Sequence, residues 1–262
     1  MCNSAVKLLY LESRSLKIPN KPNCIDFSKY YCQNVDLFQS NTRGWIITKV
    51  EKWIQEFGHK NMVLWLNINP GMDKSVITAM VVNTYIKHGV LCAWHFCTHN
   101  NLSQNTILAI LISLSGILEV NMHGYVDKLH SQNTAVLEED KSNRDVMELF
   151  IVLLVITLLL VDLPTDLNDH PVNKLIIFEA VDEMVSKYTS RIFQILRDCN
   201  TKISPWLLIF VTSRQNDNIL KILSAKVSCG YAFIVNIIIP HTRKIKTIQF
   251  NCYIKLSNYL WL

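Results

Sequence analysis

The sequence predicts an α/β fold in which helices flank a mainly parallel β-sheet on both faces. Short, almost continuously apolar segments alternate along the chain with longer segments of helical periodicity. Strands of a parallel sheet are buried on both sides and therefore read as apolar runs. The chain has 262 residues, of which 50% are hydrophobic and 18% charged, which is enough apolar material for the core of such a sheet.

The main domain is predicted over residues 41–240, with an irregular lead-in over residues 1–40 and a C-terminal tail over residues 241–262. A first helix is expected to follow an N-cap at Thr42 and to run to Phe57, because its apolar residues recur every 3.6 positions. Further helices are predicted over residues 75–87, 106–118, 146–161, 188–199 and 219–223, and strands over residues 61–66, 90–97, 175–178, 206–211 and 231–239.

The longest apolar run, residues 149–161, raises the alternative of a membrane-spanning helix. Only Thr157 interrupts this run, and Glu148 and Asp162 bound it. A membrane-spanning helix needs roughly 20 residues, whereas runs of about 10–14 are more often buried helices. We therefore expect a buried helix and no membrane span.

Charge and cysteine usage argue against several other classes of protein. The net charge of +5 comes without a dense Lys/Arg run, so nucleic-acid binding is not expected. The eight cysteines are scattered without a CxxC pair, which favours reduced thiols and a cytoplasmic location. The N-terminus lacks the apolar core of a secretory signal.

A damaged phosphate-binding loop is the most informative motif. Residues 64–75, LWLNINPGMDKS, read as a strand, a turn and a Lys–Ser pair that opens a helix. The P-loop pattern requires glycine where this chain has Ile68 and Asp73. Ile68 is expected to oppose a tight turn because β-branched residues avoid left-handed conformations. The Asp73 carboxylate would repel phosphate by about 4 kcal/mol per unit charge at about 4 Å, or pair with Lys74 and disable it.

Polar side chains also follow two later strands of the predicted sheet. The apolar segment 175–178 ends in Glu179, and Asp182 and Glu183 come three and four residues later. An apolar strand that ends in a carboxylate is the Walker B arrangement, which holds magnesium. The strand over residues 206–211 is followed by Thr-Ser-Arg, ending at Arg214. Because ligands bind at the carboxyl ends of parallel strands, these groups and Lys74 are expected to converge.

Six passages together resemble a NACHT-type domain of the STAND class of P-loop ATPases, as in nephrocystin-3-like and TANC-like ankyrin-repeat proteins. They cover roughly residues 41–225 and keep the order of that family. Besides residues 64–75 they are TRGW at Thr42 with Trp53 and Ile54, AWHFC at Ala93, GYVDKL at Gly124, EAVDE at Glu179, and SPWL at Ser204 through TSR at Thr212.

The resemblance implies a P-loop NTPase-type sheet and an ATP-dependent switch that controls assembly, with a repeat domain downstream in full-length relatives. It implies ATP or ADP with Mg²⁺ as cofactors. The catalytic residues it implies are Glu179, Asp182, Glu183 and Arg214, and the magnesium ligands are Ser75 and Glu179. The nucleotide-binding residues it implies are Asn69, Pro70, Gly71, Met72, Asp73, Lys74, Ser75 and Val76. Glu179 departs from the family's aspartate, and its longer arm shifts the metal.

Plainer interpretations stand beside these roles. His95, Cys97 and His99 share one face of a strand and could bind zinc, but we expect core residues there and no zinc or other cofactor. Asp182 and Glu183 are also explained as a solvated helix start, and Arg214 as a surface arginine.

Three functions follow from these observations. We expect first a degenerate NACHT-like module that acts as an interaction or scaffold domain, with weak or lost nucleotide binding. The first alternative is a Mg-ATP-binding switch with slow hydrolysis, at most a weak ATPase. The second is a truncated product without an independent role. Protein partners or self-association are expected in place of nucleic acid.

Overall fold

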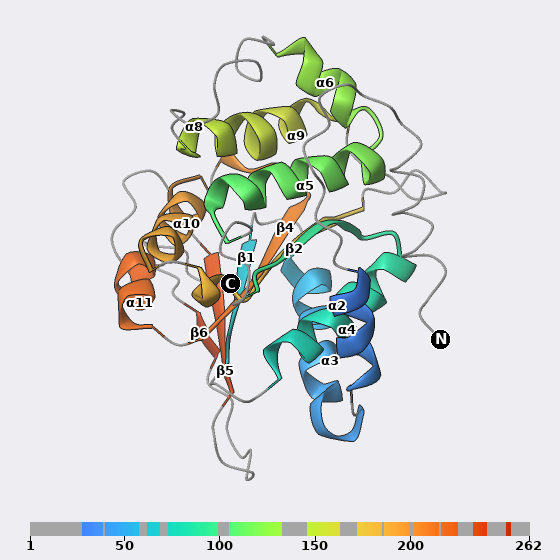
Figure 1. Cartoon of the computed structure of the whole chain (residues 1–262), viewed down its shortest axis with the longest axis vertical. Coiled ribbons are helices and arrows are strands. Elements are labelled where there is room, and N and C mark those ends of the chain that lie inside the picture. Colours follow the sequence, from blue (N-terminus) through green and yellow to red (C-terminus); the bar gives the residue numbers. More distant parts are fainter. Residues whose placement is uncertain are drawn as a thin grey trace, which may run out of the picture.

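The computed structural model describes most of the predicted main domain and short stretches on either side of it (Figure 1). Residues 69–72 and His99 lie outside the described ranges. The described ranges are 28–38, 40–57, 62–68, 73–98, 105–132, 146–162, 172–184, 186–199, 202–214, 216–224, 233–239 and 250–252.

A six-stranded sheet forms the centre of the molecule, in the order β2-β3-β4-β1-β5-β6. The first five strands in this order are parallel, and β6 runs antiparallel to β5. The predicted α/β fold with a mainly parallel sheet is therefore confirmed. The strands are β1 (Met62–Ile68), β2 (Leu91–Phe96), β3 (Lys174–Glu179), β4 (Leu207–Ser213), β5 (Phe233–Ile239) and β6 (Phe250–Cys252).

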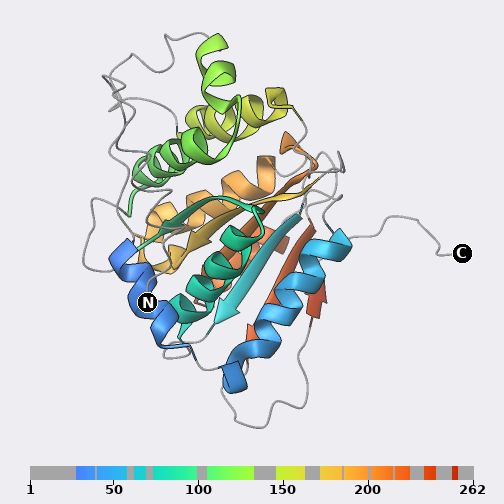
Figure 2. The same cartoon turned by 90° about the vertical axis from the view of Figure 1, so that its right-hand side faces the viewer.

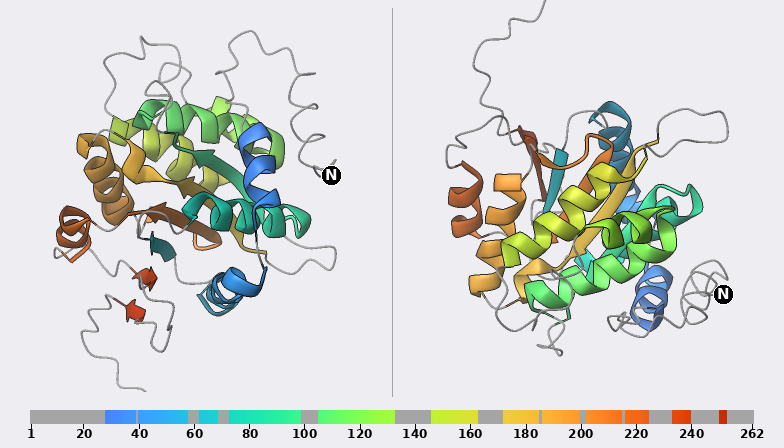
Figure 3. Two further views of the ribbon diagram at one scale, coloured as in Figure 1. Left: turned by 60° about the horizontal axis from the view of Figure 1, so that its bottom comes forward. Right: turned by 90° about the horizontal axis from the view of Figure 1, so that it is seen from above.

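Helices cover both faces of the sheet, and Figure 2 shows one face with α4 in front of the strands. That face carries α2 (Ser28–Asp36), α3 (Ser40–Phe57) and α4 (Lys74–Lys87). The opposite face carries α10 (Ser186–Cys199) and α11 (Asp217–Ser224), as the view from above in Figure 3 also shows. The remaining helices stack at the β2 end of the sheet: α5 (Ile107–Asn121), α6 (Tyr125–Ser131), α8 (Val146–Phe150), η1 (Ile151–Ile156) and α9 (Thr157–Leu160).

The central strands are apolar because they are buried on both sides. All residues of β2 and β4 are buried, and Trp65 of β1 is fully buried with its ring 5.5 Å from the ring of Phe193 on α10. This edge-on ring contact joins the sheet to the helical layer of the α10 face. The core thus lies on both sides of the strands that carry the candidate site at their ends.

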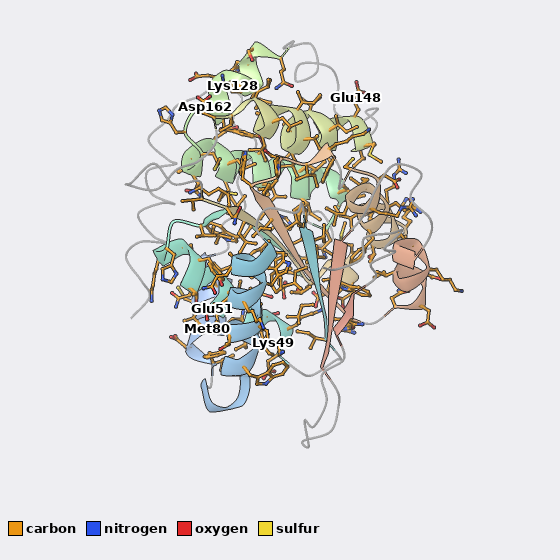
Figure 4. All side chains as sticks on the ribbon, turned by 180° about the vertical axis from the view of Figure 1, so that it is seen from behind. Lys49, Glu51, Met80, Lys128, Glu148 and Asp162 are labelled. Carbon is orange, nitrogen blue, oxygen red and sulfur yellow. The ribbon has the colours of Figure 1, made fainter. Side chains whose placement is uncertain are left out.

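The long apolar run predicted to be a buried helix is helical over α8, η1 and α9, with η1 in π-helical geometry. The hydroxyl of Thr157 donates to the carbonyl of Val152, five residues earlier, at 2.7 Å. Figure 4 labels the two acids that bound the run, Glu148 and Asp162. Among the described residues, no helix combines the length and apolarity that crossing a membrane requires. One side of the run is exposed, however, through Ile156, Leu159 and Leu160.

The structure adds detail to three sequence predictions. The lead-in over residues 1–40 is not wholly irregular, because α2 is helical and its Tyr31, which is buried, donates to Asn83 of α4 at 2.9 Å. The tail over residues 241–262 contains β6. The expected reduced thiols are found at Cys92, Cys97 and Cys199, whereas Cys32 is disulfide-bonded.

Candidate functional site

The carboxyl ends of β1, β3 and β4 meet at one edge of the sheet, where the sequence placed its candidate residues. From β1 the chain crosses β4 and β3 to reach β2, whereas from β4 it crosses β1 to reach β5. The connections after β1 and β4 therefore leave in opposite directions. In open parallel sheets such a reversal creates the crevice in which ligands bind.

Two cations converge on one carboxylate in this crevice. Lys74 opens α4, and its Nζ lies 2.5 Å from Oδ1 of Asp182 in η2 (Val181–Glu183). Arg214 follows β4, and its Nε lies 3.1 Å from Oδ2 of the same carboxylate. The Lys74 and Asp182 side chains are only 11% and 12% exposed, so solvent screens this pair weakly. The structure thus brings together three of the predicted site residues.

A second contact joins the predicted magnesium ligands. The hydroxyl of Ser75 donates to Oε1 of Glu179 at 2.7 Å. Glu179 ends β3 and is fully buried, and burial raises its pKa to about 8 even though Ser75 and Lys74 oppose the shift. Its other oxygen, Oε2, has no hydrogen-bond partner within the described residues. The neutral acid is therefore favoured at pH 7 when no cation is bound.

These donors fit a hard divalent cation. A hydroxyl and a carboxylate oxygen are ligands that Mg²⁺ accepts, and the unpartnered Oε2 offers a further lone pair. Ser75 and Glu179 would hold the ion, which would supply charge neutralisation to phosphate oxygens. Glu183 is not part of this contact, because its described hydrogen bonds run through its backbone to Ala180 and Asn105.

Four of the predicted nucleotide-binding residues lie outside the described part of the chain, namely Asn69, Pro70, Gly71 and Met72. Ile68 is the last residue of β1, fully buried and paired with Ile239 of β5. The chain is still extended at Ile68, as is favourable for a β-branched residue that avoids left-handed conformations. Asp73 instead has left-handed geometry, with φ 49° and ψ 47°, and is exposed.

Lys74 is paired with Asp182, a residue 108 positions away in the sequence. A role for Asp73 in disabling the lysine stays a prediction. Val76, the last of the predicted nucleotide-binding residues, is buried in the first turn of α4. Its side chain therefore contributes to the core.

Hydrogen bonds between side chains and the backbone on either side of Asp182 hold this residue in place. Ala180, just before η2, has φ 53°, and its N–H donates to the hydroxyl of Thr212 on β4 at 3.0 Å. Thr189 of α10 donates to the carbonyl of Val181 at 2.9 Å. The amide of Asn105 donates to the carbonyl of Glu183 at 3.2 Å. Sequence reasoning missed Thr189 and Asn105, because single polar residues outside a motif carry no local signal.

The zinc alternative gains no support from the geometry. His95 and Cys97 are buried at the end of β2, and His99 lies outside the described residues. No group of three or more His, Cys, Asp or Glu residues in the described part of the chain could hold a metal ion. Burial, reinforced by the Glu179 carboxyl, holds the pKa of Cys97 well above its ordinary value, so the thiol is inert at pH 7.

Comparison with known protein families finds a match that covers the site. A family described as "Nephrocystin 3, N-terminal" matches residues 41–214, which is about two thirds of the chain. The matched segment begins in α3 and ends at Arg214, so it contains every residue of the crevice described above. No curated protein matches the sequence.

Proposed function

Because this chain belongs to the nephrocystin-3 N-terminal family, we propose that it is a NACHT-like P-loop module that acts as an interaction or scaffold domain and binds nucleotide weakly or not at all. Asp73 is the single observation that carries the second half of this proposal. Its backbone is left-handed at the position where the P-loop pattern has glycine, so the residue keeps the geometry of the motif while adding a charge.

The charge of Asp73 opposes phosphate at the place where α4 would attract it. The first backbone N–H groups of this 14-residue helix and its dipole favour an anion. The Asp73 carboxylate already supplies negative charge there, directly before Lys74. At about 4 Å and an effective dielectric of about 20, its repulsion of one phosphate charge is about 4 kcal/mol, or nearly a thousandfold in affinity.

The interaction role is supported by the exposed side of η1 and α9. Ile156, Leu159 and Leu160 are 38%, 51% and 46% exposed on a helix whose opposite side is buried. Helices that are apolar all round are normally covered on all sides. Contiguous exposed apolar surface is typical of protein interaction sites.

Calorimetric titration with Mg-ATP and Mg-ADP tests the proposal. We expect no binding by the wild type up to millimolar nucleotide. Asp73→Gly should gain affinity by about tenfold or more, and Asp73→Asn should gain similarly, because asparagine also tolerates the left-handed conformation but carries no charge. Lys74→Ala added to either variant should abolish the gain.

Micromolar binding by the wild type that disappears in Lys74→Ala would overturn this proposal. It would favour the second candidate, a Mg-ATP-binding switch with slow hydrolysis that controls assembly. The contact between Ser75 and the buried Glu179, a ready pair of oxygen donors, is the observation that favours it. Phosphate release measured with and without Glu179→Gln then distinguishes a slow ATPase from a site that only binds.

A further inference from the structure

The cation pair of the crevice already holds an anion that belongs to the protein. Lys74 and Arg214 each bind a different oxygen of Asp182, at 2.5 Å and 3.1 Å. A carboxylate that bridges two cations with its two oxygens makes the same contacts as two oxygens of a phosphate group. We propose that Asp182 is an internal competitor that occupies the phosphate-binding cations and excludes polyphosphate until it is displaced.

The position of Asp182 is fixed by its neighbours in the chain. Val181 is fully buried and its carbonyl accepts from Thr189, and the Ala180 N–H is bound by Thr212. The N–H of Glu183 donates to the carbonyl of Ala180 at 2.8 Å, which closes the turn. The backbone therefore presents the carboxylate to the cations before any ligand arrives.

The surrounding charges do not favour an additional anion. The Asp182 carboxylate already contacts both cations, Asp73 directly precedes Lys74, and Arg214 is 53% exposed and screened by solvent. A phosphate that entered without displacing Asp182 would be repelled by that carboxylate. Only molecules in which Asp182 has released both cations can bind polyphosphate. The apparent affinity is therefore the intrinsic affinity multiplied by the fraction of such molecules.

This inference deepens the proposed function, because it concerns the same weakened site, but it depends on a different residue. Asp73 acts on the loop side of Lys74, whereas Asp182 acts from the end of β3. The two effects can be separated with an anion that needs no metal. The probe is inorganic tripolyphosphate in buffer with EDTA, titrated calorimetrically.

We expect wild-type protein to bind tripolyphosphate no better than millimolar, and Asp182→Asn to bind about 100-fold more tightly, since one nearby charge is worth two to three orders of magnitude in affinity. Adding Lys74→Ala or Arg214→Gln to Asp182→Asn should remove the gain. Asp198→Asn is the matched control: Asp198 is bound to Arg197 on α10, at 2.7 Å, and its loss should change nothing.

Asp182→Ser provides a second variant, with circular dichroism as the check on folding. A folded variant without a gain in affinity overturns the proposal, as does an equal gain in Asp198→Asn. Failure of both Asp182 variants to fold also overturns it, because Asp182 would then be a structural requirement and not an exchangeable occupant. If Asp182→Asn gains tripolyphosphate affinity while Asp73→Gly gains none for Mg-ATP, this inference stands and the argument from Asp73 fails.

Discussion

Two non-glycine residues in the described part of the chain have a positive φ, and both lie between a strand of the site and a helical turn. Asp73 precedes α4 with φ 49°, and Ala180 precedes η2 with φ 53°. Ala180 is buried, and Thr212 accepts a hydrogen bond from its N–H. Asp73 is exposed and makes no side-chain capping bond to α4. The same left-handed backbone is thus buried at Ala180, after β3, and exposed with a charged side chain at Asp73, after β1.

The difference indicates where the site tolerates change. A left-handed residue persists where its surroundings over-determine it. At the β3 junction the small side chain and the Thr212 bond do so, and the carboxylate of Asp182 is thereby aimed at the cations. At the β1 junction Asp73 is exposed, and there the sequence departs from the P-loop pattern, which has glycine at this position.

The largest expected effect is the loss of stability when Ile68, the last residue of β1, is replaced. Ile68→Ala should lower the free energy of unfolding by about 2–5 kcal/mol, because Ile68 is fully buried. Chemical denaturation measures it. Ile156→Ala is the matched control, since Ile156 is 38% exposed, and it should cost much less. An equal loss in both variants would contradict the assignment of Ile68 to the core, as would an increase in nucleotide affinity on its replacement.

The second expected effect is the loss of stability when the hydrogen bond between Ala180 and Thr212, after β3, is removed. Thr212→Val keeps the shape of the side chain but leaves the buried N–H of Ala180 without its acceptor, so it should cost about 1–3 kcal/mol. Thr48→Val, on the exposed surface of α3, is expected to stay within about 0.5 kcal/mol of the wild type. Denaturation curves measure the free energy of unfolding of both variants, and an equal change in the two would contradict a structural role for the Thr212 bond.

Glu179 predicts a pH dependence at the same junction. Its pKa is raised to about 8 by burial, so the folded protein retains a proton that the unfolded chain has lost above about pH 4.3. Stability should therefore fall as pH rises from about 5 to 8, by at most about 1.4 kcal/mol per pH unit. Glu179→Gln should flatten this slope in EDTA-containing buffer, whereas exposed Glu148→Gln should not. An unchanged slope in Glu179→Gln would contradict a buried, protonated acid.

The smallest expected effect concerns the strained backbone itself. Ala180→Gly should raise the free energy of unfolding by about 0.5 kcal/mol, because relief of the left-handed conformation slightly exceeds the extra entropy of glycine in the unfolded chain. Ala79→Gly, inside α4, should lower it by about 1 kcal/mol. Thermal unfolding distinguishes the two by sign, and a loss of stability at both positions would mean that Ala180 is not strained.

Much of the fold could be predicted because its signals are local. The apolar runs of β3 and β4 and the periodicity of α4 follow from burial on each element, and their ends bring Glu179, Lys74 and Arg214 to one edge. The helix α2 was missed because its sequence is largely polar, and its anchor, Tyr31, bonds to a residue 52 positions away. Elements secured by distant contacts leave little trace in their own residues.

The site shows the same limit. Residue types and order predicted which groups converge, but not which of them pair. The pairing of Asp182 with Lys74 depends on the direction in which η2 leaves β3, which the Thr212 and Thr189 contacts set. The first strand was predicted to end at residue 66 but continues through Ile68, because it pairs there with Ile239 of a strand far along the chain. The domain boundaries and the nucleotide-binding and catalytic roles stay predictions.

The indole of Trp65 gives the crevice a spectroscopic signature of its own. It is fully buried, and its Nε1–H donates to the hydroxyl of Ser213 at 2.7 Å, which in turn donates to the carbonyl of Arg214 at 3.0 Å. A shift of Arg214 toward a bound anion would be relayed through one serine to a chromophore whose emission depends on that bond. With the other five tryptophans replaced by phenylalanine, the colour of its fluorescence would record whether the arginine has moved.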